Sequence, residues 1–334
     1  MLNPELKLNT KIFNEGVEKE STRQGFGNGL LQAGIKNKEV VALCADLSES
    51  TKMQLFAERF PERFIEVGVA EQNLVSVASG MAAMGKIPFA SSFAIFSPGR
   101  NWEQVRTNIC YNDRPVKIAS THTGIEVGPD GGSHQMTEDI ALMRVLPNMT
   151  VISPVDAIEA KKATIACSQT KEPTYLRLTR GKSPIITTTE TPFEIGKAQI
   201  IFTPDKLLAD IGIIATGPIL YEALLASKEL EKKGIKIKLM NLSTIKPLDE
   251  DSIISLAKET KAILTVEDHQ IAGGMGSAVA EFLSRNYPVP MEFIGVKDLF
   301  GQSGTKEELY EEYHLNYTHI IKAANKLLLK KTIH

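Results

Sequence analysis

A single glutamate stands where an α/β protein usually binds its ligand. Glu71 lies in FIEVGVAEQNLVSVASGMAAMG, residues 64–85, shortly after the strand-like FIEVG. In the segment that follows, the helical spacing of Leu74, Val77, Ala78 and Met81 predicts a helix with one buried stripe. In open α/β sheets, ligands bind at the carboxyl ends of the parallel strands. Surface glutamates are common, but this position makes Glu71 a candidate for direct contact with a ligand.

A second candidate is the glycine-rich loop THTGIEVGPDGGSHQ, residues 121–135, which follows the strand-like VKIAS. It carries His122, Asp130 and His134 within thirteen positions. Loops at strand ends commonly carry function, so we predict a catalytic or substrate-binding role for these three residues. The alternative for each histidine is a buried structural residue with satisfied hydrogen bonds.

Three further polar residues suit a small phosphorylated substrate. Arg23 lies in STRQG, Ser50 in CADLSES and Arg180 in LTRG. A guanidinium binds phosphate through a planar pair of donors, and a serine hydroxyl supplies another donor. Either arginine could instead form a structural salt bridge.

Two phenylalanines could provide a flat surface for an aromatic ring. Phe93 and Phe96 lie in SSFAIF. Phenylalanines more often serve as core residues because they bury a large apolar area. The sequence alone leaves both interpretations open.

Other phosphate and metal motifs fail. The GKS of residues 181–183 lacks the glycine that a Walker A loop needs, because Leu176 stands at that position. The GGMG of residues 273–276 lacks the last small residue of a dinucleotide fingerprint, which is Val279 here. There is no HExxH motif and no CxxC pair, so we predict no metal site in this chain and interpret Cys44, Cys110 and Cys167 as buried free thiols.

Short β-rich segments alternate with helical patterns along the whole chain, which predicts parallel sheets covered by helices. We expect an α/β fold with a doubly wound parallel-sheet domain over residues 1–190 and a smaller α/β domain over residues 191–334. The boundary falls in the threonine-rich, proline-bounded SPIITTTETPFEIG, residues 183–196. The predicted strands are residues 40–44, 64–68, 87–91, 116–120, 149–153 and 174–178, then 210–216, 235–242, 262–268 and 291–296.

The composition excludes some classes of partner. The chain has 334 residues, 43% of them hydrophobic, with 38 basic and 40 acidic residues. This near balance of charge argues against broad attraction to nucleic acid or to an anionic membrane. No apolar run approaches the roughly 20 residues that span a bilayer, and the amino end has no signal-peptide pattern, so we expect a soluble, cytoplasmic protein.

An ordered set of motifs resembles the transketolases. STR, ADLSES, GVAEQN, FAIF, THTGIEVGPDGGSHQ and LPNMTVISPVD are similar, in this order, to the pyrimidine-binding domain of that family, and LTRG closes it. VEDHQIAGGMGSAVAE resembles the family's carboxyl-terminal domain. The resemblance covers about residues 20–325 and assigns these two domain types to residues 1–190 and 191–334.

The resemblance also shows a missing part. Transketolases hold the diphosphate of thiamine diphosphate through Mg²⁺ at a GDG…N motif in a separate domain, and this chain contains no GDG. It therefore resembles the C-terminal subunit of a split transketolase. The resemblance implies an N-terminal partner subunit that carries the diphosphate and Mg²⁺ site, activity only with that partner, and a heterotetramer with two copies of each chain.

The resemblance further implies a reaction and a role for each candidate residue. A two-carbon ketol unit would pass from a ketose phosphate to an aldose phosphate through thiamine diphosphate, as in the pentose phosphate pathway. Glu71 would hydrogen-bond a nitrogen of the aminopyrimidine and favour the imino tautomer that removes the thiazolium proton. Phe96 would stack on the pyrimidine and Phe93 would line its pocket. Sugar hydroxyls would be contacted by His122, Asp130 and His134, with a histidine moving protons, and the substrate phosphate by Arg23, Ser50 and Arg180.

Some positions depart from the family pattern. Gln72 replaces a histidine, Gly99 replaces a pyrimidine-contacting tyrosine, and residues 131–133 read Gly-Gly-Ser where Gly-Pro-Thr is more familiar. These changes leave the donor and acceptor sugars, and the histidine that carries each proton, open. Three alternatives also stay open. They are a transketolase variant for a sulfonated or branched sugar, a subunit related to deoxyxylulose phosphate synthase or to the β subunit of a 2-oxoacid dehydrogenase, and a non-catalytic binding or scaffold module.

Overall fold

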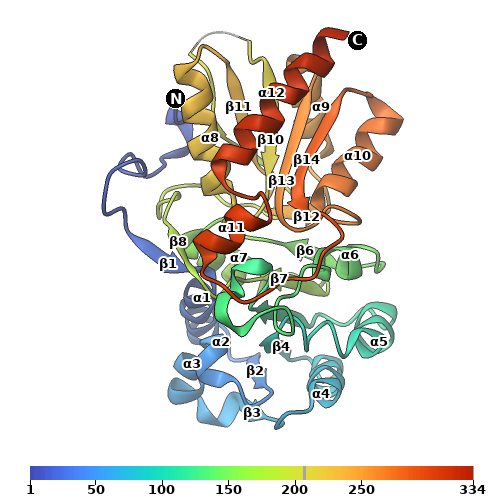
Figure 1. Ribbon diagram of the computed structural model, residues 1–334. Coiled ribbons are helices and arrows are strands. Elements are labelled where there is room, and N and C mark those ends of the chain that lie inside the picture. Colours follow the sequence, from blue (N-terminus) through green and yellow to red (C-terminus); the bar gives the residue numbers. More distant parts are fainter. Residues whose placement is uncertain (206–207, 334) are drawn as a thin grey trace.

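The first half of the chain supplies six strands of a seven-stranded sheet in the computed structural model, which describes residues 1–205 and 208–333 (Figure 1). Six of the strands are parallel, and β12 adds antiparallel at one edge. In spatial order the strands are β12 (Thr244–Lys246), β6 (Thr150–Ile152), β7 (Thr174–Arg177), β5 (Lys117–Thr121), β4 (Ile87–Phe93), β2 (Val40–Cys44) and β3 (Phe64–Glu66).

Helices cover both faces of this sheet, as a buried parallel sheet requires. Successive residues of β2 point to opposite faces, so Val40 and Ala42 pack in one apolar cluster and Val41 and Leu43 in the other. The first cluster includes residues of α1 and α7, and the second includes residues of α4. The α-helices of this half are α1 (Thr22–Lys36), α2 (Ser48–Thr51), α3 (Gln54–Arg59), α4 (Glu71–Ala83), α5 (Trp102–Gln104), α6 (Asp139–Arg144) and α7 (Ala157–Cys167).

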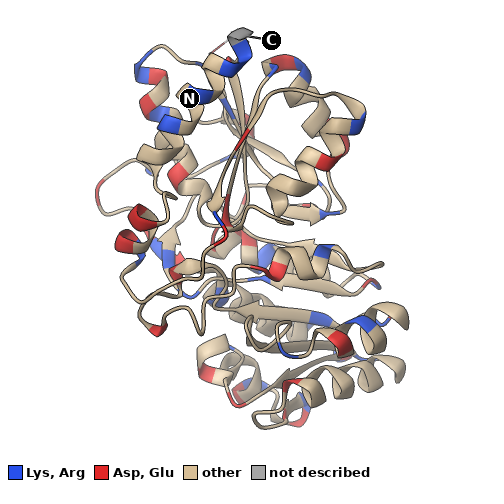
Figure 2. Cartoon of the chain, turned by 45° about the vertical axis from the view of Figure 1, so that its right-hand side comes forward, with Lys and Arg blue, Asp and Glu red and all other residues tan. Residues whose placement is uncertain are grey.

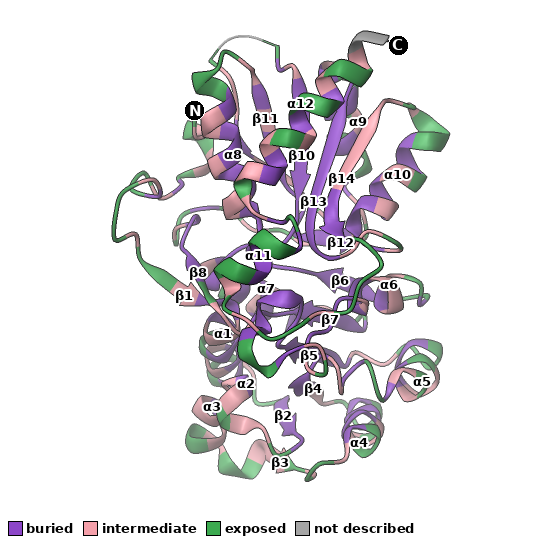
Figure 3. Cartoon of the chain, in the orientation of Figure 1, coloured by how far each residue is buried: buried purple, intermediate pink, exposed green. Residues whose placement is uncertain are grey.

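The second half forms a five-stranded sheet. Four strands are parallel and β9 is antiparallel at the edge. In spatial order the strands are β14 (Met291–Val296), β13 (Ile263–Gln270), β10 (Ile211–Ala215), β11 (Ile237–Asn241) and β9 (Gln199–Phe202). Its helices are α8 (Leu220–Lys232), α9 (Glu250–Thr260), α10 (Met275–Asn286), α11 (Lys306–Glu312) and α12 (Tyr317–Ile333). Figure 3 shows that burial concentrates on the strands of both sheets.

Two connections tie the halves together through the backbone. Strand β12 follows β11 in the chain but pairs with β6 of the first sheet. The amino-terminal residues lie against the second half, where the amide of Asn3 donates to the carbonyl of Ile201 at 2.9 Å. Strand β1 (Lys19–Ser21) then pairs with β8 (Lys182–Pro184).

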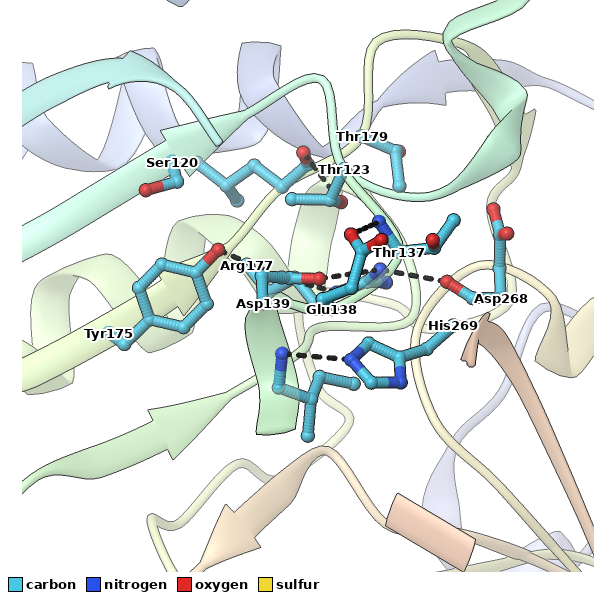
Figure 4. A network of polar contacts seen from close by, with 12 residues as sticks. Ser120, Thr123, Thr137, Glu138, Asp139, Tyr175, Arg177, Thr179, Asp268 and His269 are labelled. Atoms are coloured by element: carbon cyan, nitrogen blue, oxygen red, sulfur yellow. Dashed lines mark hydrogen bonds and ion pairs between the residues drawn. The ribbon is translucent and has the colours of Figure 1, made fainter. Parts of the chain in front are cut away.

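A buried polar network also joins the two halves (Figure 4). Arg177, at the end of β7, donates through Nε to Oδ2 of Asp139 at 2.8 Å and through Nη2 to the carbonyl of Asp268 at 2.8 Å. Tyr175 donates its hydroxyl to the same Asp139 oxygen at 2.8 Å. Because each of these side chains is at most 4% exposed, the charges are paired inside the protein rather than solvated.

The predicted α/β fold with two parallel-type sheets is confirmed. All ten predicted strands are present, with ends that shift by at most two residues. Within residues 1–205 and 208–333, the strands that the sequence did not predict are β1, β8, β9 and β12. The predicted burial of the three free cysteines is also confirmed.

Charged residues of both signs are interspersed along the helices and loops (Figure 2). This arrangement agrees with the small net charge of the sequence. Among the helices of residues 1–205 and 208–333, none is long and apolar enough to cross a membrane.

Candidate active site at the carboxyl edge of the first sheet

The predicted site residues gather at one edge of the seven-stranded sheet. Because β2, β3, β4, β5 and β7 are parallel in register, their carboxyl ends meet at the same edge. Arg23 joins them from the first turn of α1, directly after β1. The residues that follow or end these strands are Ser50 after β2, Glu71 after β3, Phe93 on β4, His122 after β5 and Arg180 after β7.

Glu71 is the first residue of α4 and is 4% exposed. Ser92 donates its hydroxyl to Oε1 of Glu71 at 3.2 Å. Asn101 donates its side-chain amide to the backbone carbonyl of Glu71 at 2.8 Å. Among the described residues, no hydrogen bond reaches Oε2. The carboxyl group is thus held in place with one oxygen left for a ligand.

Helix α4 places Glu71 because its apolar side packs on the sheet. Leu74 and Ala78 are fully buried, as the helical spacing predicted. Val77 and Met81, which belong to the same predicted stripe, are only partly buried against the apolar cluster that contains Leu74. The helix therefore has a fixed face, and its first residue has a fixed position.

Four rings form a cluster beside the glutamate, and we call Phe93, Phe96, His122 and His134 the ring cluster. Phe93 stacks on His122 with ring centroids 3.6 Å apart, and lies nearly parallel to Phe96 at 6.0 Å. His134 approaches Phe96 edge-on at 5.7 Å. The structure thus joins both predicted phenylalanines to both predicted loop histidines.

The backbone of His122 adopts φ +60°, an uncommon conformation for a residue other than glycine. Its Nδ1 lies 2.9 Å from the hydroxyl of Thr121, and the side chain is 2% exposed. Burial lowers the pKa of His122 to about 3, and the positive charges of Arg23 and Arg180 act in the same direction. A neutral imidazole can both donate and accept a hydrogen bond, which suits contact with sugar hydroxyls.

The two predicted arginines lie close enough to repel each other. Burial lowers the pKa of Arg23, and the charge of Arg180 lowers it further. Arg23 donates through Nη1 to the backbone carbonyl of Ser50 at 2.7 Å, while its buried Nε has no partner among the described residues. An anion between two such guanidinium groups would relieve their repulsion.

Arg180 is oriented by the loop that carries the histidines. It donates through Nη1 to the carbonyl of Val127 at 2.6 Å, and the same nitrogen lies 3.5 Å from Oδ1 of Asp130. Asp130, predicted to contact a sugar hydroxyl, is thus an ion-pair partner of Arg180 in this structure. A substrate that binds both Arg180 and Asp130 would find the two side chains already held together by their ion pair.

The sequence did not identify Ser92 and Asn101, which contact Glu71. Ser92 directly follows the predicted strand of residues 87–91, and this position at the carboxyl edge of the sheet was the available signal. Asn101 carried no signal, because its contact depends on how residues 94–101 fold back. The sequence also provided no indication of the contacts that the second half of the chain makes with the histidine loop.

The residues fit part of a thiamine diphosphate site. The buried carboxyl of Glu71 has an oxygen available for a ring nitrogen, and Phe96 is a half-buried aromatic ring in the adjoining cluster. Within the described ranges, no group of three histidine, cysteine, aspartate or glutamate residues could hold a metal ion. These residues can therefore receive the pyrimidine end of the cofactor.

Known proteins resemble this chain along nearly its whole length. Residues 18–185 match the family description "Transketolase, pyrimidine binding domain", and residues 204–320 match "Transketolase, C-terminal domain". A relative from Methanocaldococcus jannaschii, named as a transketolase C-terminal section, is 45% identical over 303 residues, which cover 90% of this chain and 94% of the relative.

A second relative, from Clostridium sp., is named "6-deoxy-6-sulfo-D-fructose transketolase subunit SqwH". It is 37% identical over 319 residues, which cover 96% of this chain and 98% of that protein. The solved structure titled "Split gene transketolase, inactive beta4 tetramer" matches with a TM-score of 0.86 and 42% identity, over 93% of this chain and 99% of its own. The resemblance seen in the sequence is thus confirmed, and the chain belongs to the transketolase family, corresponding to its pyrimidine-binding and C-terminal domains.

Proposed function

We propose that this chain is the C-terminal subunit of a two-chain transketolase, which moves a two-carbon ketol unit from a ketose phosphate to an aldose phosphate. The observation that carries the proposal is the carboxyl edge of the first sheet. There, one edge holds a buried carboxyl group, a cluster of aromatic rings and two arginines. This combination suits a ligand with an aromatic ring next to a substrate with an anionic end.

The transketolase family depends on thiamine diphosphate, which supplies, when bound, the nucleophilic carbon that accepts and passes on the two-carbon unit. In our proposal, Glu71 holds the proton at the aminopyrimidine nitrogen, while Phe93 and Phe96 provide the apolar wall. His122, Asp130 and His134 then bind and orient the sugar hydroxyls. Glu71 and the two histidines are the groups able to move a proton at the reacting end.

Arg23 and Arg180, with Ser50, bind the substrate phosphate in this proposal. The mutual repulsion of the two guanidinium groups and the unpartnered Nε of Arg23 support an anion site between them. Binding the phosphate there fixes the far end of the sugar and leaves its carbonyl near the ring cluster.

The diphosphate and its Mg²⁺ belong, in our proposal, to an N-terminal partner subunit. Two findings support this division. The sequence contains no GDG motif, and a relative that is matched along 94% of its length is itself named as a C-terminal section. We further propose a heterotetramer with two copies of each chain, because closed twofold assemblies are the common arrangement of such subunits.

A sulfonated sugar is the second candidate substrate. The Clostridium relative is named for a sulfonated fructose, and a sulfonate offers the same oxygen acceptors to an arginine pair as a phosphate does. A phosphate dianion carries more charge at neutral pH than a sulfonate. We therefore expect the two arginines to favour the phosphate, although both anions fit the same donors.

The test is transfer of a two-carbon unit from xylulose 5-phosphate to ribose 5-phosphate, with thiamine diphosphate and Mg²⁺ present. The chain is assayed with a candidate partner that carries a GDG…N motif, and 6-deoxy-6-sulfofructose is supplied as an alternative donor. Transfer from xylulose 5-phosphate supports the proposal. Transfer from the sulfonated donor alone identifies the second candidate, and no transfer from either donor by a mixture that binds the cofactor contradicts both.

A further inference from the structure

The second half of the chain holds the histidine loop. Ser303 donates its hydroxyl to the carbonyl of Pro129 at 2.9 Å, directly beside Asp130. Gln135, at the end of the loop, donates its side-chain amide to the carbonyl of Gln302 at 3.0 Å. Residues 302 and 303 lie in the connection from β14 to α11, so a segment of the second domain lies over the candidate active-site loop.

The strongest of these contacts is a buried ion pair. Nζ of Lys306, the first residue of α11, lies 2.6 Å from Oε2 of Glu126, and the hydroxyl of Tyr310 donates to the same oxygen at 3.3 Å. The Glu126 side chain is fully buried and that of Lys306 is 24% exposed. We call Glu126, Lys306 and Tyr310 the loop latch.

The position of Lys306 is informative because a helix amino terminus disfavours positive charge. The cap of α11 is otherwise favourable, since Thr305 and Glu308 form a capping box. The carboxylate of Glu126 offsets the unfavourable placement of Lys306 and raises the pKa of Lys306 despite its burial. The lysine is thus stabilised by the loop rather than by its own helix.

Glu126 lies next to the backbone that orients Arg180, the residue predicted to bind the substrate phosphate. The next residue, Val127, accepts the 2.6 Å hydrogen bond from Nη1 of Arg180 through its carbonyl. On the other side, a Cβ placed on Gly181 would lie 3.2 Å from Oε1 of Glu126. Glu126 is therefore joined through the chain to Val127 and lies against Gly181, the residue after Arg180. Moving Glu126 would move the carbonyl of Val127, which orients Arg180.

We propose that the loop latch is a positioning device through which the C-terminal domain sets the orientation of Arg180, and thereby the affinity for the anionic end of the substrate. Lys306 and Tyr310 are positioning residues, since neither contacts Arg180 directly. This inference rests on the proposed function only for the role of Arg180 as the ligand of a sugar phosphate.

The test compares two broken ion pairs in the same domain. Lys306→Met removes the latch, and Lys238→Met removes the pair that Lys238 forms with Glu259 at 2.5 Å, whose side chains are 23% and 20% exposed. Ribose 5-phosphate is titrated into the full chain by calorimetry. We expect Lys306→Met to weaken binding roughly 2- to 30-fold and Lys238→Met to leave it unchanged.

Two further variants keep the test independent of folding defects. Glu126→Gln breaks the pair from the other side, and combining it with Lys306→Met should weaken binding little more than either change alone, because both remove one interaction. Lys306→Arg keeps the charge and should restore most of the affinity. Thermal unfolding of every variant shows which of them are folded at the titration temperature.

A kinetic comparison distinguishes positioning of Arg180 from a general structural role, because only the former changes KM for a phosphorylated donor selectively. In the reconstituted enzyme, Lys306→Met should raise KM for a phosphorylated donor and leave kcat nearly unchanged. With erythrulose, an unphosphorylated ketose, both constants should stay close to those of the unsubstituted chain. Equal losses with both donors would overturn the latch.

The outcomes separate the two proposals. If Arg180→Ala weakens ribose 5-phosphate binding and folded Lys306→Met does not, the latch is wrong and the phosphate site stands. If Lys238→Met weakens binding as much as Lys306→Met, the effect is general and the latch is again wrong. If Arg180→Ala binds ribose 5-phosphate as the unsubstituted chain does, the phosphate site itself is wrong, and the latch then has no anion site to act on.

Discussion

At the scale of single residues, Glu71 is held by contacts that leave one of its carboxyl oxygens available for a ligand. Its Oε1 accepts from Ser92, and its backbone carbonyl accepts from Asn101, while Oε2 has no partner among the described residues. A carboxyl group fixed in this way can exchange a proton with a ligand without moving.

Glu71→Gln keeps the volume of the side chain and its oxygen for Ser92, but replaces the carboxyl group by an amide, which cannot exchange a proton with the ligand. We expect the variant to fold normally and to lose two-carbon transfer by roughly 100-fold or more in the reconstituted enzyme. Ser92→Ala, which removes only the supporting hydrogen bond, should lose less. Full transfer by Glu71→Gln would show that the carboxyl proton is not needed.

Arg180 is predicted to act on substrate binding rather than on the chemical step. A hydrogen bond to a charged group contributes about 1.5–3 kcal/mol, so Arg180→Ala should raise KM for a phosphorylated sugar roughly 10- to 150-fold. Arg285→Ala, on the exposed end of α10, is the matched control and should leave KM unchanged. An unchanged KM in Arg180→Ala would remove this residue from the phosphate site.

The buried imidazole of His122 makes stability depend on pH. Its pKa falls from an ordinary 6.5 to about 3 in the folded chain because of burial and the neighbouring arginines. Between these values the unfolded chain binds the proton and the folded chain does not, so the free energy of unfolding decreases as pH falls from 6.5 towards 3.

Replacing His122 by Asn should reduce that dependence by up to about 1.4 kcal/mol per pH unit, since one titrating group is lost. Asn also tolerates the positive φ at this position. Urea unfolding of both chains at several pH values measures the slope. His269, whose pKa burial lowers to about 4, should keep part of the slope in either chain. Identical slopes would contradict a neutral His122.

The site residues were predictable to the extent that their signal was local. The motifs around Glu71 and His122 stand in the sequence, and their gathering at one sheet edge follows from parallel strands. Glu126 could not be singled out, because its partner Lys306 lies 180 positions away and the pairing exists only after the domains pack. The pairing of Asp130 with Arg180 was also missed, because it forms only once two strand-end loops of the first sheet meet.

At the scale of the elements, the packing of helix α4 on the core fixes the position of Glu71. Leu74 is fully buried one turn after the glutamate. Leu74→Ala leaves a cavity under that turn and should lower the free energy of unfolding by about 2–5 kcal/mol in urea titrations. Val77→Ala, on the partly exposed side, should cost clearly less. A loss below about 1 kcal/mol for Leu74→Ala would show that the first turn does not depend on this contact.

The longest buried strands were all predicted, and the four missed strands have only three or four residues each. Strand β2 reads VVALC because both of its faces are buried, a pattern visible in the sequence. Strands β1, β8 and β12 have only three residues each and show no such run. The pairing of β12 depends on β6 in the other half of the chain, which no local pattern encodes.

At the scale of the whole molecule, the two halves share more than a linker. Strand β12, the Arg177 network and the loop latch each connect the first sheet to the second domain. The second domain thus has a physical route to the candidate active site. Such long-range contacts are also the part of the fold that sequence patterns predict least well.

We propose that this chain supplies one half of an active site whose other half lies on a partner. The most direct measurement is the rate of two-carbon transfer as this chain is titrated into a fixed amount of a GDG…N partner with thiamine diphosphate and Mg²⁺. We predict no transfer by either chain alone and a rate that saturates at one copy of this chain per partner. Full transfer by this chain alone, or none at any ratio in a mixture that binds the cofactor, would contradict the account.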